Sequence, residues 1–177
     1  MEKLIVAPAR EEELPEILRI YASARRFMRE SGNPRQWEEG YPSRELLLED
    51  IRERRLFTLR NREEIAGVFV FFTGEEPTYR VIENGAWLSD APYGTIHRIA
   101  GNGKTHGILR AALRYASGIT GHLRIDTHGE NLVMQRHLEN EGFRYCGVIR
   151  VRGNSPRLAY ERLGTEEEED RQKKETR

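Results

Sequence analysis

The chain has 177 residues, and its 29 Lys and Arg residues balance 29 Asp and Glu residues, so the formal net charge is zero. This length suits one domain with a substantial core, and the charge balance excludes a whole-chain field that would attract nucleic acid or an anionic membrane surface. A single cysteine, Cys146, excludes an internal disulfide framework and a thiolate-rich metal site.

The first half of the sequence predicts strands and helices around a structured loop. Its expected elements are a strand at 3–7, a helix at 11–29, a helix at 44–54 with Ser43 as N-cap, and strands at 56–60 and 65–73. The N-terminal apolar run is broken by Pro8 and is too short for a signal peptide or a membrane span, so we expect a cytoplasmic protein. Residues 31–43 contain Trp37 and Tyr41 among Gly, Pro and Asn, which favours an ordered loop over a linker.

The second half predicts a regular alternation of strands and helices followed by a charged tail. Its expected elements are a loop at 74–93, a strand at 95–100, a glycine loop at 101–107, a helix at 108–117, a strand at 122–127, a helix at 131–140, and strands at 145–151 and 157–162. Residues 164–177 are almost entirely charged and cannot contribute to a core. We therefore expect one domain over residues 1–163 and a disordered tail over 164–177.

The glycine loop lies in the stretch RIAGNGKTHGILRAAL, residues 98–113, whose Gly-Lys-Thr resembles the end of a P-loop. A P-loop requires glycine five residues before Gly103, but that residue is Arg98. A dinucleotide-binding fingerprint fails as well, because its glycine spacing differs and too few βα units follow. The remaining interpretation needs only free amides and a helix dipole at a helix N-terminus, which suit any pyrophosphate.

At this loop the sequence resembles the GNAT superfamily of acyl-CoA-dependent N-acyltransferases. The family motif is a strand, then Arg/Gln-x-x-Gly-x-Gly/Ala, then a helix, and here it corresponds to residues 104–109. Lys104 replaces the usual Arg or Gln, and Leu109 replaces the usual small residue. The segment LRIDTHGENLVMQRHLENEGFRYCGVI is similar to the second half of the family fold. The upstream segments RFMRESGNPRQWEEGYPS and GAWLSDAPYGTIHRIA are similar to one bacterial branch of the family, so the resemblance covers about residues 1–163.

The resemblance implies an α/β (α+β) fold in which a mixed central sheet of about seven strands is flanked by four helices. It also implies acetyl-CoA as co-substrate, without a metal, and a small-molecule amine as acceptor. In the family a backbone amide of the strand before the glycine loop holds the transferred carbonyl, and the loop amides hold the pyrophosphate. The residues that would bind acetyl-CoA here are Ile99, Ala100, Lys104, Thr105, His106, Gly107, Ile108, Leu109 and Asn131.

The candidate catalytic residues are Asp126 and His128. Many GNAT enzymes use a tyrosine seven residues after the helix-opening asparagine to protonate the leaving thiolate, but seven residues after Asn131 lies Leu138. Asp126 and His128 are two residues apart at a strand end, so both side chains can point to one side and form a proton shuttle. The alternative is that His128 only hydrogen-bonds the following loop.

The resemblance places the acceptor near the loop between the first two helices and the segment before the fourth strand. Asn33 and Gln36 offer amide groups, and Trp37 and Trp87 offer flat apolar walls, a combination that suits a small amine with a carbonyl or apolar arm. The alternative for Trp37 is that it anchors a long loop to the core.

Two other kinds of chemistry are disfavoured by the sequence. Cys146 lacks a recognisable base, and a free cysteine is most often a small buried hydrophobe. The five histidines show no metal-ligand spacing.

Three hypotheses remain open. The first is a GNAT-fold acyltransferase in which the amine attacks directly, without nucleic acid or a membrane as partner; the resemblance also allows a homodimer contact through the final strands. The second is a non-catalytic GNAT-fold binding or regulatory protein, suggested by Leu109 and by the missing tyrosine at Leu138. The third is a nucleotide-binding α/β domain.

Overall fold

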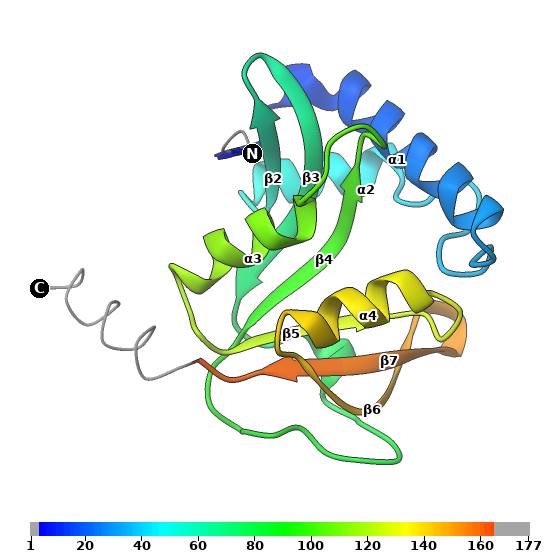
Figure 1. Cartoon of the computed structure of the whole chain (residues 1–177), viewed down its shortest axis with the longest axis vertical. Helices are drawn as coiled ribbons and strands as arrows, with labels where there is room; N and C mark the ends of the chain where they lie inside the picture. Colours follow the sequence, from blue (N-terminus) through cyan, green and yellow to red (C-terminus); the bar gives the residue numbers. More distant parts are fainter. Residues whose placement is uncertain (1–3, 165–177) are drawn as a thin grey trace, which may run out of the picture. The chain divides into compact units, whose positions relative to one another are not determined.

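The structure is a computed structural model that describes residues 4–164, so all but Gly164 of the predicted tail lies outside the described residues. Within this range, seven strands and four α-helices follow one another in the order β1, α1, α2, β2, β3, β4, α3, β5, α4, β6, β7 (Figure 1). The strands form one mixed sheet in the order β1-β2-β3-β4-β5-β7-β6. The predicted fold class is confirmed.

The chain divides into two compact units, and each unit consists of two stretches that are separate in the sequence. Within the described residues, the first unit comprises residues 4–71 and 97–113, and the second comprises residues 72–96 and 114–164. Strand β4 contributes its end to the first unit and its beginning to the second.

The first unit is built from antiparallel strands and the helices that precede them. Its elements are β1 (Ile5–Pro8), α1 (Leu14–Glu30), α2 (Arg44–Arg52), β2 (Leu56–Asn61), most of β3 (Glu64–Thr73), the end of β4 (Gly94–Gly101) and the first part of α3 (Ile108–Ser117). Strand β2 pairs antiparallel with β1 and β3, and Phe57 stacks on Phe69 across the second pair with ring centroids 5.5 Å apart. Strand β3 is buried from Ile65 to Phe71, as its continuous apolar run predicts.

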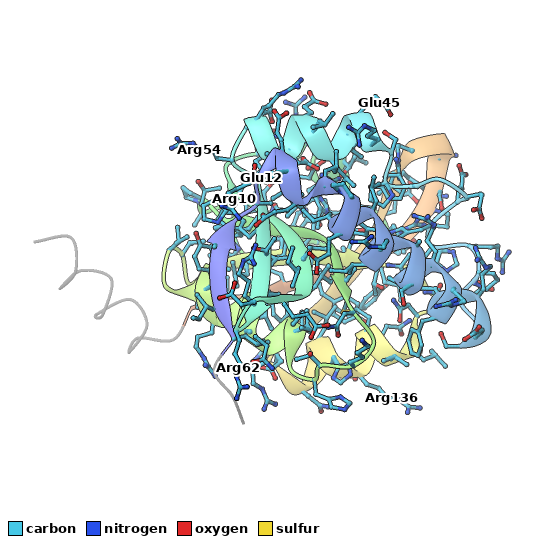
Figure 2. All side chains as sticks on the ribbon, turned by 90° about the horizontal axis from the view of Figure 1, so that it is seen from above. Arg10, Glu12, Glu45, Arg54, Arg62 and Arg136 are labelled. Atoms are coloured by element: carbon cyan, nitrogen blue, oxygen red, sulfur yellow. The ribbon has the colours of Figure 1, made fainter. Side chains whose placement is uncertain are left out.

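A polar side chain caps α2 in this unit, and charged side chains lie on its surface. Ser43 Oγ accepts a hydrogen bond from the Leu46 amide at 3.2 Å, so the predicted N-cap of α2 is confirmed. The exposed side chains of Glu45 and Arg54 lie at the outer edge of the view in Figure 2.

The second unit is built around β5, β7 and β6. Its elements are the start of β4, the end of α3, β5 (Leu123–Thr127), α4 (Leu132–Asn140), β6 (Arg144–Val151) and β7 (Ser155–Arg162). Strand β7 pairs antiparallel with both β5 and β6, whereas the start of β4 pairs parallel with β5.

The segment predicted as a loop over residues 74–93 carries some regular structure. It contains a short 3-10 helix, Pro77–Tyr79. Glu83 also forms an antiparallel bridge with Val148 of β6, with both N–O distances at 2.8 Å. This segment is therefore held against β6 by backbone hydrogen bonds.

Candidate functional site

The loop between β4 and α3 is folded around the side chain of Asn102. Asn102 Oδ1 accepts hydrogen bonds from the amides of Lys104, at 2.9 Å, and Thr105, at 3.0 Å. Gly103 and Gly107 have φ angles of +78° and +81°, a left-handed conformation that glycine adopts without steric cost. No atom lies within 4 Å of the place where either glycine would carry a Cβ, so the backbone conformation alone requires glycine there.

The start of α3 lies close to the first unit's strands because β3 has a glycine at position 67. A Cβ on Gly67 would lie 2.8 Å from Ile108 Cγ2 and 2.9 Å from the carbonyl oxygen of Ala100. Both distances are shorter than ordinary van der Waals contact, so a larger residue would push these groups apart. Gly67 therefore sets how closely the first turn of α3 approaches β3 and β4.

The start of α3 offers backbone donors to an anion. The first N–H groups of an α-helix have no partner inside the helix, and the helix dipole concentrates positive charge at the same end. The amides of Lys104 and Thr105 instead donate to Asn102, so an anion would meet them only after that side chain moves. Of the residues predicted to hold a pyrophosphate, those at 106–109 therefore fit best.

A buried network around Arg98 of β4 lies in the first unit, and its residues were not among the predicted site residues. We call Tyr21, Tyr41, Asp50 and Arg98 the Arg98 network. The Tyr21 hydroxyl donates to the Arg98 carbonyl oxygen at 2.7 Å. The Arg98 guanidinium donates to Asp50 Oδ2 at 2.6 Å and to the Tyr41 hydroxyl at 3.4 Å.

Burial perturbs the titration of this network. Desolvation raises the pKa of Asp50, which the neighbouring Arg98 only partly opposes. Desolvation also raises the pKa of Tyr21 well above its ordinary value, so the hydroxyl remains protonated and able to donate. The two side chains of the Arg98–Asp50 ion pair are only 14% and 6% exposed.

The loop between α1 and α2 brings the predicted acceptor residues together. Asn33 Nδ2 donates to Gln36 Oε1 at 2.8 Å, and Asn33 is buried. Trp37 packs edge-on between Tyr21 and Tyr41, with ring centroids 5.6 Å and 6.2 Å away. Among residues 4–164, Asn33 Oδ1 has no hydrogen-bond partner although it is buried. Trp37 thus packs against the core, as its alternative role as a loop anchor requires, and the acceptor-binding role of Asn33, Gln36 and Trp37 stays a prediction.

In the second unit, Asp126 accepts a hydrogen bond from the buried Tyr79. The Tyr79 hydroxyl lies 2.7 Å from Asp126 Oδ1, and burial together with the Asp126 charge raises the pKa of Tyr79 well above its ordinary value. Trp87 donates its indole N–H to the Tyr79 carbonyl at 2.9 Å, and the Arg124 guanidinium lies 4.1 Å from the centre of its ring. Trp87 therefore holds its own segment in place, and its predicted role as an acceptor wall stays a prediction.

His128 and Asn131 shape the loop that leads from β5 into α4. His128 Nδ1 accepts a hydrogen bond from the Glu130 amide at 3.2 Å, which is the loop contact that the sequence left as the alternative to catalysis. Asn131 Oδ1 accepts from the Met134 amide at 3.1 Å and caps α4. The proton-shuttle role of Asp126 and His128 and the acetyl-CoA role of Asn131 stay predictions.

The second unit also contains a cluster of buried charges centred on Glu161. Glu161 is fully buried, and its Oε1 lies 2.5 Å from His122 Nε2 and 2.8 Å from Arg124 Nε. Its Oε2 accepts a hydrogen bond from the Leu88 amide. His122 Nδ1 lies 3.1 Å from the Pro92 carbonyl oxygen, so each ring nitrogen has an oxygen atom within hydrogen-bond distance. This cluster fixes the segment 88–92 to β5 and β7.

Cys146 and Leu138 occupy buried positions. Burial raises the pKa of the Cys146 thiol to about 11, with a further contribution from Glu161, so the thiol stays protonated near neutral pH. Leu138 is fully buried and belongs to the apolar face of α4.

No group of three or more His, Cys, Asp or Glu side chains within residues 4–164 is arranged to hold a metal ion. In the same range no helix is long and apolar enough to cross a membrane.

Known structures share this fold over most of the chain, although no protein-family model and no curated protein matches the sequence. An acetyltransferase of the GNAT family from Streptococcus agalactiae 2603 is 28% identical, with a TM-score of 0.82 over 92% of this chain and 96% of that one. A GNAT-family acetyltransferase from Listeria monocytogenes 4b F2365 is 15% identical, with a TM-score of 0.66 over 90% and 94%. An acetyltransferase from Thermus thermophilus is 21% identical, with a TM-score of 0.60 over 92% and 99%. The resemblance carried by the sequence is thereby confirmed: the chain has the fold of GNAT-family acetyltransferases.

Proposed function

We propose that the protein is an acyl-CoA-dependent N-acyltransferase that moves an acetyl group from acetyl-CoA to the amine of a small molecule. The observation that carries this proposal is the loop folded around Asn102, which leads into the N-terminus of α3, where the first amides of a helix have no partner within the helix. The likeness to acetyltransferases supports acyl transfer as the reaction class.

Direct attack needs little covalent chemistry from the protein. The amine nitrogen bonds to the acyl carbon, the carbon–sulfur bond breaks, the thiolate takes up a proton and the nitrogen loses one. Backbone amides at residues 106–109 would hold the pyrophosphate, and the β4 backbone at Ile99 and Ala100 would donate to the transferred carbonyl. Asp126 and His128 are the side chains that we propose for the proton transfers.

The acceptor that we propose carries an N–H group beside an apolar arm. The buried Asn33 Oδ1 has no partner among the described residues and can accept from such an N–H group. The partly exposed aromatic side chains of Trp37 and Tyr41 offer apolar surface near the same loop.

Acetyl-CoA is expected to raise the melting temperature of the protein. At about 100 times its Kd, a ligand that binds only the folded state adds about 2.7 kcal/mol to the free energy of unfolding, which corresponds to about 5–10 °C for a chain of this length. Differential scanning fluorimetry with acetyl-CoA, NAD and ATP measures the shift, and release of free thiol in the presence of amines measures turnover. A shift with NAD or ATP but not with acetyl-CoA would favour the nucleotide-binding alternative.

The second candidate is a GNAT-fold protein that binds acyl-CoA without catalysis. It is favoured by Leu138, which is buried where many family members have the tyrosine that protonates the thiolate. This candidate predicts that acetyl-CoA raises the melting temperature while no amine releases thiol. The catalytic proposal predicts both effects.

The variant His128→Ala is expected to lower kcat for thiol release by about 100-fold, the lower end of what general acid–base catalysis contributes. His137→Ala is the matched control, because His137 is an exposed histidine on the neighbouring α4 and is expected to leave kcat unchanged. Steady-state kinetics at saturating acetyl-CoA makes the comparison. Full turnover by the His128 variant would show that its contact with the Glu130 amide is structural only.

A further inference from the structure

Arg98 has a backbone conformation that is unusual for its position. It has a φ angle of +49° in the middle of β4, whereas non-glycine residues rarely adopt left-handed conformations and strands do not use them in regular ladders. Such strained residues persist only where the surrounding structure fixes them, and they gather at functional sites.

Two elements of the first unit hold Arg98 in this conformation. Helix α1 supplies the Tyr21 hydroxyl to its carbonyl oxygen, and helix α2 supplies Asp50 to its guanidinium. A buried ion pair such as Arg98–Asp50 is costly to desolvate, and apolar residues of similar size could fill the same space. Its presence indicates a requirement beyond packing.

The Tyr21 contact determines the direction of a neighbouring amide. The carbonyl of Arg98 and the N–H of Ile99 belong to one planar peptide unit, in which a trans bond points them in opposite directions. A hydroxyl that fixes the carbonyl therefore also fixes the Ile99 N–H, pointing away from Tyr21. Hydrogen bonding at the carbonyl also polarises the peptide unit and makes its N–H a stronger donor.

We propose that the Arg98 network positions and polarises the Ile99 N–H as the donor to the oxygen of the transferred acyl group. This inference rests on the proposed acyl transfer and adds the residues that set its donor. Tyr21, Asp50 and Arg98 are positioning residues in it, because they act through the peptide unit of Arg98 and Ile99. A donor fixed in advance stabilises the negative charge that develops on the oxygen as the amine attacks.

The kinetic test is Tyr21→Phe, which removes the hydroxyl and keeps the ring against Trp37. We expect kcat to fall at least about tenfold while the KM for acetyl-CoA changes less than about twofold, because the contact acts in the transition state. Tyr160→Phe is the matched control: Tyr160 is similarly buried but lies outside the Arg98 network, and its variant should keep both parameters. Asp50→Asn should lower kcat in the same way, and Asp50→Glu should restore part of it. A folded Tyr21 variant with wild-type kcat would overturn the inference.

A second readout does not depend on turnover. In protein labelled with ¹⁵N-isoleucine, the Ile99 amide proton should move upfield in Tyr21→Phe and stay in place in Tyr160→Phe, and acetyl-CoA should shift it in the wild type. If the chemical shift of the Ile99 amide proton changes neither with the substitution nor with acetyl-CoA, the inference is wrong. A resonance that responds to both in a protein that releases no thiol with any amine would support the positioning and refute the proposed reaction.

Discussion

Replacing Glu161 with glutamine is expected to lower the free energy of unfolding by about 3–5 kcal/mol, the cost typical of removing one partner from a buried charge pair. Glutamine keeps the shape of the side chain but not its charge, so Arg124 would lose its counter-ion and His122 its carboxylate partner. Arg124 is itself buried and lies against the rings of Trp87 and Tyr93, where water cannot replace the carboxylate. Urea denaturation of the two proteins at pH 7 measures the difference.

Glu83→Gln is the matched control for this prediction. Glu83 pairs with Arg150 at 3.0 Å in the same unit, but both side chains are 42% exposed. Exposed pairs contribute at most about 1 kcal/mol, so this variant should unfold almost like the wild type. Equal losses in the two variants would show that burial of the Glu161 charge does not govern the stability of this unit.

The effect of Glu161 should depend on pH in a defined direction. Burial raises the pKa of Glu161, but hydrogen bonds from His122, Arg124 and the Leu88 amide outweigh it and hold the pKa below the ordinary value of 4.5. The unfolded chain therefore binds this proton at higher pH than the folded protein does, and the stabilisation is complete above about pH 5. It is lost as the pH falls through the folded pKa, so the difference between wild type and Glu161→Gln should shrink towards pH 3.

The order of helices and strands could be predicted from the sequence because the spacing of apolar residues within each short segment distinguishes a helix from a strand. The run over 65–73 is apolar throughout and forms the buried β3, and Ser43 precedes α2 as its cap. The structure differs from the predicted elements mainly where hydrogen bonding to residues distant in sequence determines where a strand or bridge forms. Strand β7 begins at Ser155, two residues before the predicted start, because it continues its pairing with Val151 of β6. The bridge between Glu83 and Val148 likewise depends on a partner 65 residues away.

The candidate site was predictable only where its residues are neighbours in sequence. Asn33, Gln36 and Trp37 could be proposed together because they fall in one short loop that the family resemblance places near the acceptor, and their role there stays a prediction. The role of Arg98 could not be predicted from the sequence, because its partner Asp50 lies 48 residues earlier. In addition, no local sequence pattern predicts an arginine with a positive φ angle. The role of Asn102 could in principle have been predicted from the sequence. In an Asx turn an asparagine side chain accepts a hydrogen bond from the amide two residues later, as Asn102 does from Lys104.

Replacing Gly85 with alanine is expected to lower the free energy of unfolding by about 3 kcal/mol, the upper part of the range for overpacking. An alanine Cβ there would lie 1.9 Å from the carbonyl oxygen of Cys146, a backbone atom that cannot rotate away. Strand β6 approaches so closely because Gly147 also lacks a Cβ, which would lie 2.6 Å from the Glu83 carbonyl oxygen. Thermal unfolding should show the loss as a decrease of about 6–12 °C in Tm.

Gly129→Ala separates this steric effect from the general cost of replacing a glycine. Gly129 is exposed in the same unit, and no atom lies within 4 Å of where its Cβ would be. Its φ also lies outside the left-handed range, so alanine should be neutral or slightly stabilising there through the unfolded chain. A Gly85 variant as stable as the Gly129 variant would mean that residues 83–85 can leave β6 without loss, and that the bridge between Glu83 and Val148 contributes little. A large difference would show that this backbone contact holds the segment leading to Leu88, whose amide completes the hydrogen bonds of Glu161.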